Sequence, residues 1–151
     1  MASKFEGAAS RAATAGAAGH GWQRSPIVWQ VLSALLLLAM GGIHLALVFQ
    51  WARGLLGVLF VLNAIGGLVL AIAMLAARRL LRLASLLSLL FMAGTLLALV
   101  LALTVGLFGI TEKLSTALVV TTLIVESIGT AVLAVTTVLS FGTRRDAWAG
   151  R

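Results

Sequence analysis

The chain has 151 residues, of which 62% are hydrophobic and only 10% are charged. Soluble domains carry about 25% charged residues, so a compact soluble fold cannot hide this much apolar surface, and lipid is the expected solvent. The net charge is +7, but the basic residues form short clusters beside apolar runs rather than a stripe with aromatics, which argues against nucleic-acid binding. The chain has neither cysteine nor tyrosine, which excludes disulfides, thiolate metal sites and a cysteine nucleophile.

The N-terminal stretch, residues 1–26, is rich in Ala, Gly and Ser and has no periodic apolar face. This composition predicts a disordered cytoplasmic tail, although its few acids and scattered Arg also resemble a transit peptide faintly. Ser25 and Pro26 then suit the N-cap and the first position of a helix. The apolar run that follows continues through Phe49, past the usual length of a signal peptide, which favours an uncleaved helix.

Four apolar runs occupy most of the remaining chain, at residues 27–50, 55–77, 84–107 and 116–141. Each is longer than the about 20 residues that a helix needs to cross a bilayer. Helices are expected because lipid offers no partners to free backbone groups, and the short connections make successive helices adjacent and antiparallel. The predicted fold class is an all-α membrane protein with an antiparallel four-helix transmembrane bundle over 27–141 and a second cytoplasmic tail over 142–151.

The basic residues predict the orientation of this bundle. Nine fall in the two tails and the second connection, namely Lys4, Arg11, Arg24, Arg78, Arg79, Arg82, Arg144, Arg145 and Arg151. The opposite side has only Arg53 and Lys113. Because cytoplasmic segments carry the excess of Lys and Arg, both termini are predicted to be cytoplasmic. Trp29 and Trp51 stand at opposite ends of the first run, as interfacial anchors do.

Small residues indicate where the helices pack, because close contact between helices in lipid needs small side chains. The candidates are Gly94, Ala98, Ala102 and Gly106 in the third run, Gly67 and Ala71 in the second, and Gly42 and Ala46 in the first. The four in the third run recur every four residues and therefore share one face. Ala and Gly are abundant throughout the chain, so chance is the alternative explanation.

Three polar residues, His44, Asn63 and Glu126, lie inside the apolar runs. A carboxylate near the bilayer centre costs at least about 2.5–3.5 kcal/mol on insertion scales, so such residues are expected to face the bundle interior and find partners. The helical rise places the three about 9, 12 and 15 Å from the outer ends of their helices, which is nearly one level in the outer half. Glu112 lies in the outer connection just above. These four residues form the candidate proton or ligand site.

The segments GGIHLALVF, GVLFVLNAIGG and VGLFGITEKL, with VES in the last run, resemble a group of small four-helix membrane proteins from actinobacteria. The resemblance covers roughly residues 30–140 and rests on His44, Asn63, Glu112, Glu126 and their neighbours. It implies the four-helix fold and a bacterial plasma membrane, and it marks these positions, but it implies no reaction.

Three uses of the polar cluster stay open. In a structural role, hydrogen bonds between helices would fix the register, each contributing about 0.6 to 2 kcal/mol. In a ligand or proton site open to the outside, a pair of His44 and Glu126 would change protonation near neutral pH. A metal site would use His44, Glu126 and Glu112, a weak pattern with a single imidazole. Haem held by two histidines would need two copies of the chain, because His44 is the one histidine inside the apolar runs.

The predicted function is a non-enzymatic membrane bundle or accessory subunit, because no nucleophile–base–acid set and no cofactor motif is recognisable. The expected partners are the lipid bilayer and either a membrane protein or a second copy of the chain; no cofactor is expected. The alternative is a small transporter or a proton- or ligand-binding protein that uses Glu126 and His44. Small multidrug exporters also have four helices and a buried glutamate, but theirs lies in the first helix and Glu126 lies in the fourth.

Overall fold

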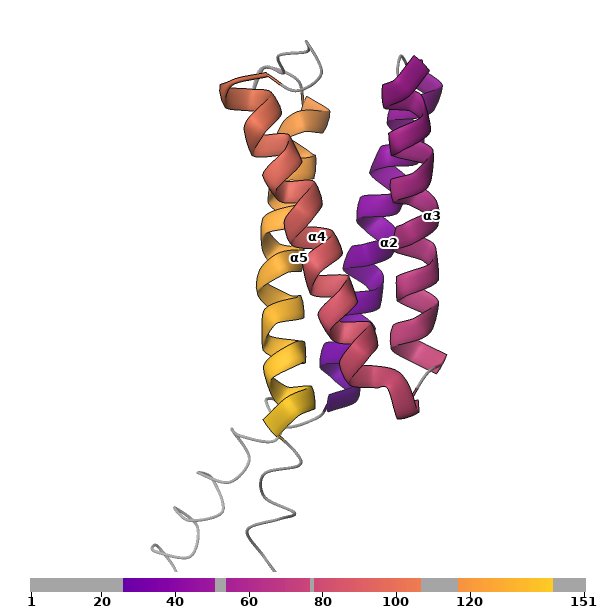
Figure 1. Ribbon diagram of the computed structural model, residues 1–151, viewed down its shortest axis with the longest axis vertical. Coiled ribbons are helices and arrows are strands. Elements are labelled where there is room, and N and C mark those ends of the chain that lie inside the picture. Colours follow the sequence, from indigo (N-terminus) through magenta and orange to yellow (C-terminus); the bar gives the residue numbers. More distant parts are fainter. Residues whose placement is uncertain (1–25, 51–53, 77, 107–116, 143–151) are drawn as a thin grey trace, which may run out of the picture.

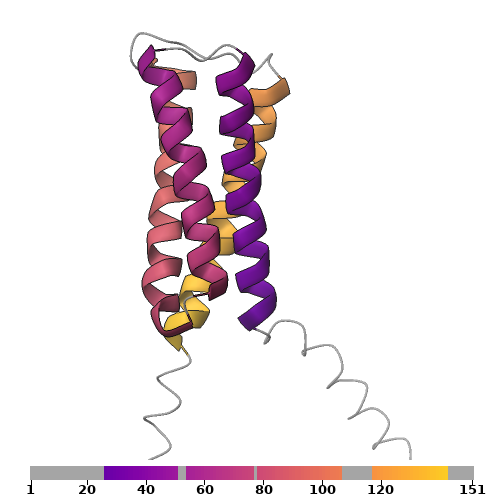
Figure 2. The ribbon, with the colours of Figure 1, turned by 90° about the vertical axis from the view of Figure 1, so that its right-hand side faces the viewer.

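The computed structural model describes residues 26–50, 54–76, 78–106 and 117–142. They form the long helices α2 (Pro26–Gln50), α3 (Gly54–Ala76), α4 (Leu81–Thr104) and α5 (Ala117–Gly142), with the short 3-10 helix η2 (Arg78–Leu80) before α4. Figures 1 and 2 show the four long helices side by side, with their axes roughly aligned. By length and composition, all four can cross a membrane. The described part of the chain is therefore all-helical and has the make-up of a multi-pass membrane protein.

Several predicted features lie outside the described residues: Glu112 and all but one residue of each tail predicted over 1–26 and 142–151. The two exceptions are helical, since Pro26 begins α2 and Gly142 ends α5. The described helices differ from the predicted ranges mainly in α4, which begins at Leu81 rather than 84 and ends at Thr104 rather than 107. Gly106 has a φ of +82°, in the left-handed region that glycine adopts without penalty, and it ends the helix. Gly106 is thus not part of the small-residue face of this helix.

The exterior of the bundle is more apolar than its interior. Large apolar side chains are exposed on every long helix, as at Phe49, Leu55, Leu90 and Val138. Several buried side chains are instead polar, namely Ser33, His44, Ser85, Ser88, Thr122, Glu126 and Thr136. A protein in water avoids both arrangements, whereas lipid makes an apolar exterior favourable and draws polar groups inward.

The closest helix contact joins α2 and α3 through glycines. A Cβ atom built on Gly67 would lie 2.8 Å from the carbonyl oxygen of Leu37, so only glycine allows this approach. Ala71 is buried one turn further along. On α2 the contacting residue is Gly41, whose Cβ would lie 3.2 Å from a carbonyl oxygen of α3, whereas a Cβ on Gly42 would meet nothing within 4 Å. The contact predicted at Gly42 is therefore made by its neighbour.

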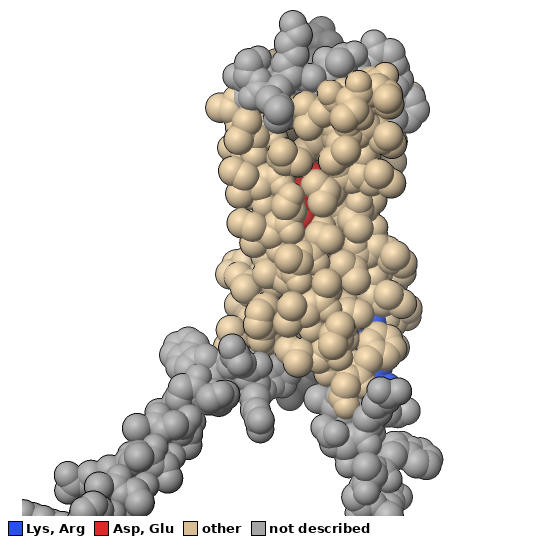
Figure 3. Space-filling view, turned by 90° about the vertical axis from the view of Figure 1, so that its left-hand side faces the viewer, with Lys and Arg blue, Asp and Glu red and all other residues tan. Residues whose placement is uncertain are grey.

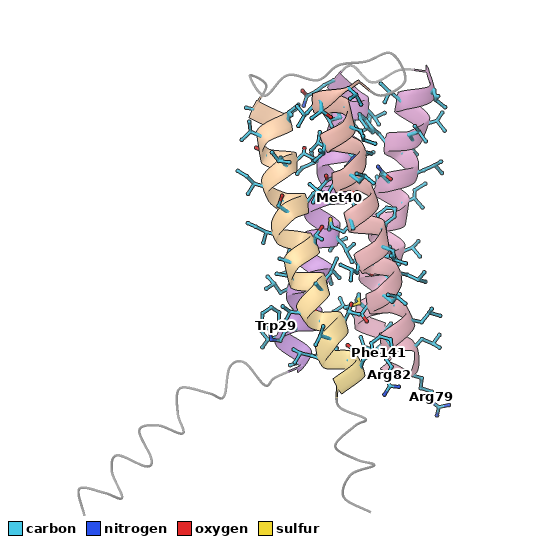
Figure 4. All side chains as sticks on the ribbon, turned by 60° about the vertical axis from the view of Figure 1, so that its left-hand side comes forward. Trp29, Met40, Arg79, Arg82 and Phe141 are labelled. Carbon is cyan, nitrogen blue, oxygen red and sulfur yellow. The ribbon has the colours of Figure 1, made fainter. Side chains whose placement is uncertain are left out.

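Two side chains of α4 fill the middle of the bundle. Met92 packs on Gly129 of α5, where an added Cβ would lie 2.9 Å from the Met92 Cε. Phe91 packs on Gly66 of α3, where an added Cβ would lie 2.8 Å from the ring. Met40 of α2 is fully buried nearby and is marked in Figure 4. We call these five residues the waist, because they separate the upper and lower halves of the bundle as drawn in Figure 1.

The lower half is a continuous packed core in which hydrogen bonds also join neighbouring helices. Leu37, Met74 and Leu133 are almost completely buried there. The hydroxyls of Ser33 on α2 and Thr136 on α5 are 2.9 Å apart. The Ser33 hydroxyl thus reaches another helix, because Thr136 lies opposite it.

The lower end of the bundle carries the described basic side chains. Figure 4 shows Trp29, Arg79, Arg82 and Phe141 at this end, and Figure 1 places both the first turn of α2 and the last turn of α5 there. Arg82 lies in the first turn of α4, not in a connection as predicted. Its Nε donates a hydrogen bond of 3.0 Å to the carbonyl of Ser140, and its guanidinium lies 5.8 Å from the centre of the Phe141 ring. Arg82 therefore joins α4 to α5.

Candidate functional site

A cavity of about 630 Å³ lies among the four long helices in the upper half. This volume falls within the about 300–1,000 Å³ of typical small-molecule sites. The walls are mostly apolar, with Leu47, Leu59, Leu99 and Val119 among them. The polar lining residues include His44, Asn63 and Glu126, the three membrane residues singled out from the sequence. The structure therefore brings the described members of the predicted cluster to one space.

The cavity exists because the helices separate toward the top. Figure 1 shows the pair α2 and α3 moving away from the pair α4 and α5 in that direction, and α3 and α4 contact each other least of the neighbouring helices. Gly94, Ala98 and Ala102 line the cavity from α4. A Cβ on Gly94 would meet nothing within 4 Å, so no described helix packs closely there. In the described fold the predicted contact face of α4 makes room instead of closing a contact.

His44 and Glu126 face each other across the base of this space. The Nε2 atom of His44 lies 4.0 Å from the Oε1 atom of Glu126. The His44 residue is 6% exposed and Glu126 is 1% exposed. The separation is too long for a direct hydrogen bond, which needs about 2.7–3.2 Å between nitrogen and oxygen. The two groups are thus close enough to interact through their charges or through one atom placed between them.

The orientation of the His44 ring follows from two contacts. Its Nδ1 atom lies 3.0 Å from the carbonyl oxygen of Met40, one helical turn earlier. A carbonyl can only accept, so this hydrogen bond places the ring N–H on Nδ1. The ring also meets Phe60 of α3 edge to face, with 5.2 Å between the ring centres. In the neutral ring, Nε2 therefore presents a lone pair toward Glu126.

Both oxygens of the Glu126 carboxyl are buried, and neither has a partner at hydrogen-bonding distance among the described residues. The Thr95 hydroxyl faces it from α4 but donates its hydrogen to the carbonyl of Met92 over 2.9 Å. Thr122, one turn from Glu126, likewise donates to its own helix, to the carbonyl of Leu118 over 2.7 Å. A buried polar group without a hydrogen bond is costly. A proton, a water molecule or a ligand group is needed to complete this site.

The view in Figure 3 shows how isolated this carboxyl is. Acidic atoms appear at one place in the upper half, recessed among uncharged side chains, and basic atoms appear only near the lower end. Glu126 is the single acidic residue within the described ranges 26–50, 54–76, 78–106 and 117–142. No described cation other than a protonated His44 stands beside it.

The remaining predicted residues are Asn63 and Glu112. Asn63 is half-buried and lines the cavity, and its amide makes no hydrogen bond with the described part of the chain. Glu112 lies outside the described residues. Within the described ranges no three His, Cys, Asp or Glu residues gather to hold a metal ion, and of the hypothetical metal set the structure describes only His44 and Glu126.

Two aromatic residues of the site were missed from the sequence. Phe60 and Phe91 both line the cavity. Phe60 lies three residues before Asn63 and hence on the same helical face, which is a signal that the sequence did contain. Phe91 lies four residues before the buried Thr95 and hence on the same helical face, so the hydroxyl marked this side of α4 in the sequence as well.

No protein-family model, curated protein or solved structure matches this chain. The four apolar helices define the class, a helical membrane protein. The resemblance to actinobacterial proteins stays a prediction, and the function has to be argued from the cavity.

Proposed function

We propose that this chain is an integral membrane protein that binds a small molecule, without chemical conversion, in its upper cavity. The proposed topology is an antiparallel bundle with both termini in the cytoplasm of a bacterium, which places the cavity in the outer half of the plasma membrane. The excess of Lys and Arg in the tails and the second connection supports this topology. Arg79 and Arg82 at the lower end agree with it.

The surroundings of Glu126 are the main support for a binding site. Its carboxyl is buried, lines a cavity of about 630 Å³ and receives no hydrogen bond from the described residues. Placing such a group near the bilayer centre costs at least about 2.5–3.5 kcal/mol. A cluster that only fixed helix register would bond its members to each other, yet His44 stays 4.0 Å away. A binding site tolerates this cost because the ligand completes it.

Binding explains the cavity better than transport through this conformation. A transporter must connect its site to both sides of the membrane, whereas here the waist fills the centre of the bundle below the cavity. Phe91 belongs both to the waist and to the cavity lining. A proton-coupled transporter that uses Glu126 and His44 is the related candidate, and it would require the waist to open.

The test is whether a small molecule travels with the protein and depends on the cavity. Ala98→Leu fills the space from α4, whereas Ala131→Leu makes the same change at an exposed position of α5. Native mass spectrometry of the protein purified in mild detergent should show one bound molecule in the wild type and in Ala131→Leu, and none in Ala98→Leu. Finding all three proteins empty, or all three loaded, would count against a site in the cavity.

A second candidate, an accessory subunit or self-associating bundle, is favoured by the open side of α4. Gly94 is exposed and no described helix covers it, and small residues of this kind accept a helix of another chain. The chain contains no cysteine, so Gly94→Cys gives a single thiol. Disulfide formation between copies in native membranes at Gly94→Cys, but not at the exposed control Ala131→Cys, would support self-association. Equal cross-linking at both positions would argue against it.

A further inference from the structure

The chemical class of the ligand follows from the base of the cavity, where His44 and Glu126 face each other without a hydrogen-bond donor between them. We infer, resting on the proposed binding function, that the cavity takes an amphiphilic amine whose protonated nitrogen lies between His44 and Glu126. Its apolar body lies among the leucines and the phenylalanines of the wall.

The atoms that face each other at the base of the cavity are both hydrogen-bond acceptors. Nδ1 of His44 is held by the Met40 carbonyl, so the neutral ring offers Nε2 as an acceptor, and the ionised carboxyl of Glu126 offers only acceptors. Two acceptors that face each other at 4.0 Å need a donor between them. A single nitrogen about 2.8 Å from each, the usual length for a charged N–H donor, spans this gap. A protonated amine has N–H groups for both atoms.

The Glu126 carboxyl has no permanent positive charge near it within the described residues. Among the described residues, His44 on α2 is the only titratable group that faces Glu126, since the lining residues from α3 and α4 are all uncharged. Arg79 and Arg82 lie at the opposite end of the bundle. An ionised carboxyl in an apolar cavity is stabilised strongly by an opposite charge, because the local dielectric is low. The cation that the described protein does not provide is supplied by the ligand.

The rest of the cavity lining suits an apolar group that carries one positive charge. The walls around the polar base are apolar, and Phe60 and Phe91 present aromatic rings to the cavity. A cation near an aromatic face gains further stabilisation. The apolar walls suit an apolar ligand body, whereas a hydrated metal ion or a sugar would leave its polar groups without partners there. An anionic head group would meet the Glu126 carboxyl with like charge. The lining therefore favours one positive charge joined to an apolar body.

The same geometry couples binding to protons. A proton on Glu126 removes the charge that attracts the amine, and a proton on His44 removes the Nε2 acceptor and adds a like charge. Binding of the amine therefore competes with protonation of both groups. Acidification should weaken binding of an amine and leave a neutral analogue unaffected.

The experiment uses the full chain in phosphatidylcholine nanodiscs and two fluorescent probes with the same ring. One is 1-naphthylmethylammonium and the other is the neutral 1-naphthylmethanol. The ammonium should bind at least about tenfold more tightly, which corresponds to about 1.4 kcal/mol. Its affinity should fall as the pH is lowered, while that of the alcohol stays constant.

Two variants assign the effect to the two residues. Glu126→Gln keeps the shape of the side chain and should reduce the ammonium affinity to that of the alcohol, whose own binding does not change. His44→Phe should weaken the ammonium by about fivefold, as expected for one lost hydrogen bond of about 1 kcal/mol. Circular dichroism checks that both variants keep the helical fold, and Ala131→Leu serves as the unaffected control.

The outcomes separate this inference from the proposed function. Equal affinities for the two probes, with both lost in Ala98→Leu, would leave the cavity as a ligand site and overturn the amine. If neither probe binds, but a native molecule co-purifies with the wild type and not with Ala98→Leu, the cavity is still a ligand site, and the inference of an amine ligand is wrong. If neither probe binds and nothing co-purifies, both the amine and the binding function are wrong.

Discussion

The two halves of the bundle are made from the same kinds of helix but are packed differently. In the lower half, Leu37, Met74 and Leu133 are buried completely or nearly so. Ser33 and Thr136 are bonded across helices there, and the buried groups without a described partner are neutral hydroxyls such as that of Ser88. In the upper half the helices separate around a cavity of about 630 Å³, and the carboxyl of Glu126 receives no donor from the described residues. The lower half resembles a structural core, and the upper half resembles a site.

The contrast shows where this protein gives up stability. Tight packing gives the dispersion contacts that hold helices together in lipid, where the hydrophobic effect contributes little. The upper half forgoes those contacts and keeps a costly buried carboxyl. Function often requires such locally unfavourable arrangements. Substitutions in the two halves should therefore differ in size and even in sign.

The largest effect is expected where α2 and α3 touch in the middle of the bundle. Gly67→Val would place side-chain atoms against the Leu37 carbonyl, which an added Cβ already approaches to 2.8 Å. The helices would have to move apart, with an expected loss of about 3 kcal/mol, the upper part of the usual range for overpacking. Unfolding in mixed micelles, followed by circular dichroism, measures this loss. Gly42→Val, at a position with no atom within 4 Å, should change stability little; a similar loss in both would refute the close contact.

The next largest effect compares the same truncation in both halves. Leu133→Ala removes a fully buried side chain of the lower half and should cost about 2 kcal/mol, the low end for leucine because lipid surrounds the chain in both states. Leu99→Ala removes a side chain that already borders the cavity and should cost less than about 0.5 kcal/mol, since few contacts are lost. The same unfolding assay decides between them. Equal costs would mean that the upper half is as tightly packed as the lower.

A change at Glu126 should have the opposite sign. Glu126→Leu replaces a buried carboxyl without a described partner by an apolar side chain, and we expect a gain of about 1 kcal/mol in the ligand-free protein, as found for other buried charges. The amine probe should no longer bind. Loss of stability in this variant would show that the carboxyl has a structural role.

The smallest effect concerns the hydrogen bond between Ser33 and Thr136 in the lower half. Ser33→Ala removes this bond of 2.9 Å and should cost about 0.6 kcal/mol, the average for hydrogen bonds between membrane helices. Ser88→Ala is the matched control, because the Ser88 hydroxyl is buried without a partner among the described residues. Its removal should be neutral or slightly stabilising. If Ser33→Ala and Ser88→Ala lower the free energy of unfolding equally, the hydrogen bond between Ser33 and Thr136 does not stabilise the bundle.

The sequence predicted the class of the protein and the members of the site better than their arrangement. His44, Asn63 and Glu126 could be singled out because a polar residue in an apolar helix is costly wherever the helix packs. The contact faces were harder, because small residues lie on more than one side of a helix, as at Gly41 and Gly42 of α2. Gly41 rather than Gly42 therefore contacts α3, and the face with Gly94 borders the cavity rather than a helix.

Four helices long enough to cross a bilayer follow from the sequence alone, because run length and the absence of charge decide whether a segment is stable in lipid. The facing of His44 and Glu126 at 4.0 Å was decided only by the tertiary structure. So were the Phe60 contact that orients the imidazole and the cavity beside it. These features depend on how far the helix pairs separate above the waist. That separation depends on side chains that lie between the two pairs, such as Phe91 of α4 against Gly66 of α3, and not on any one helix.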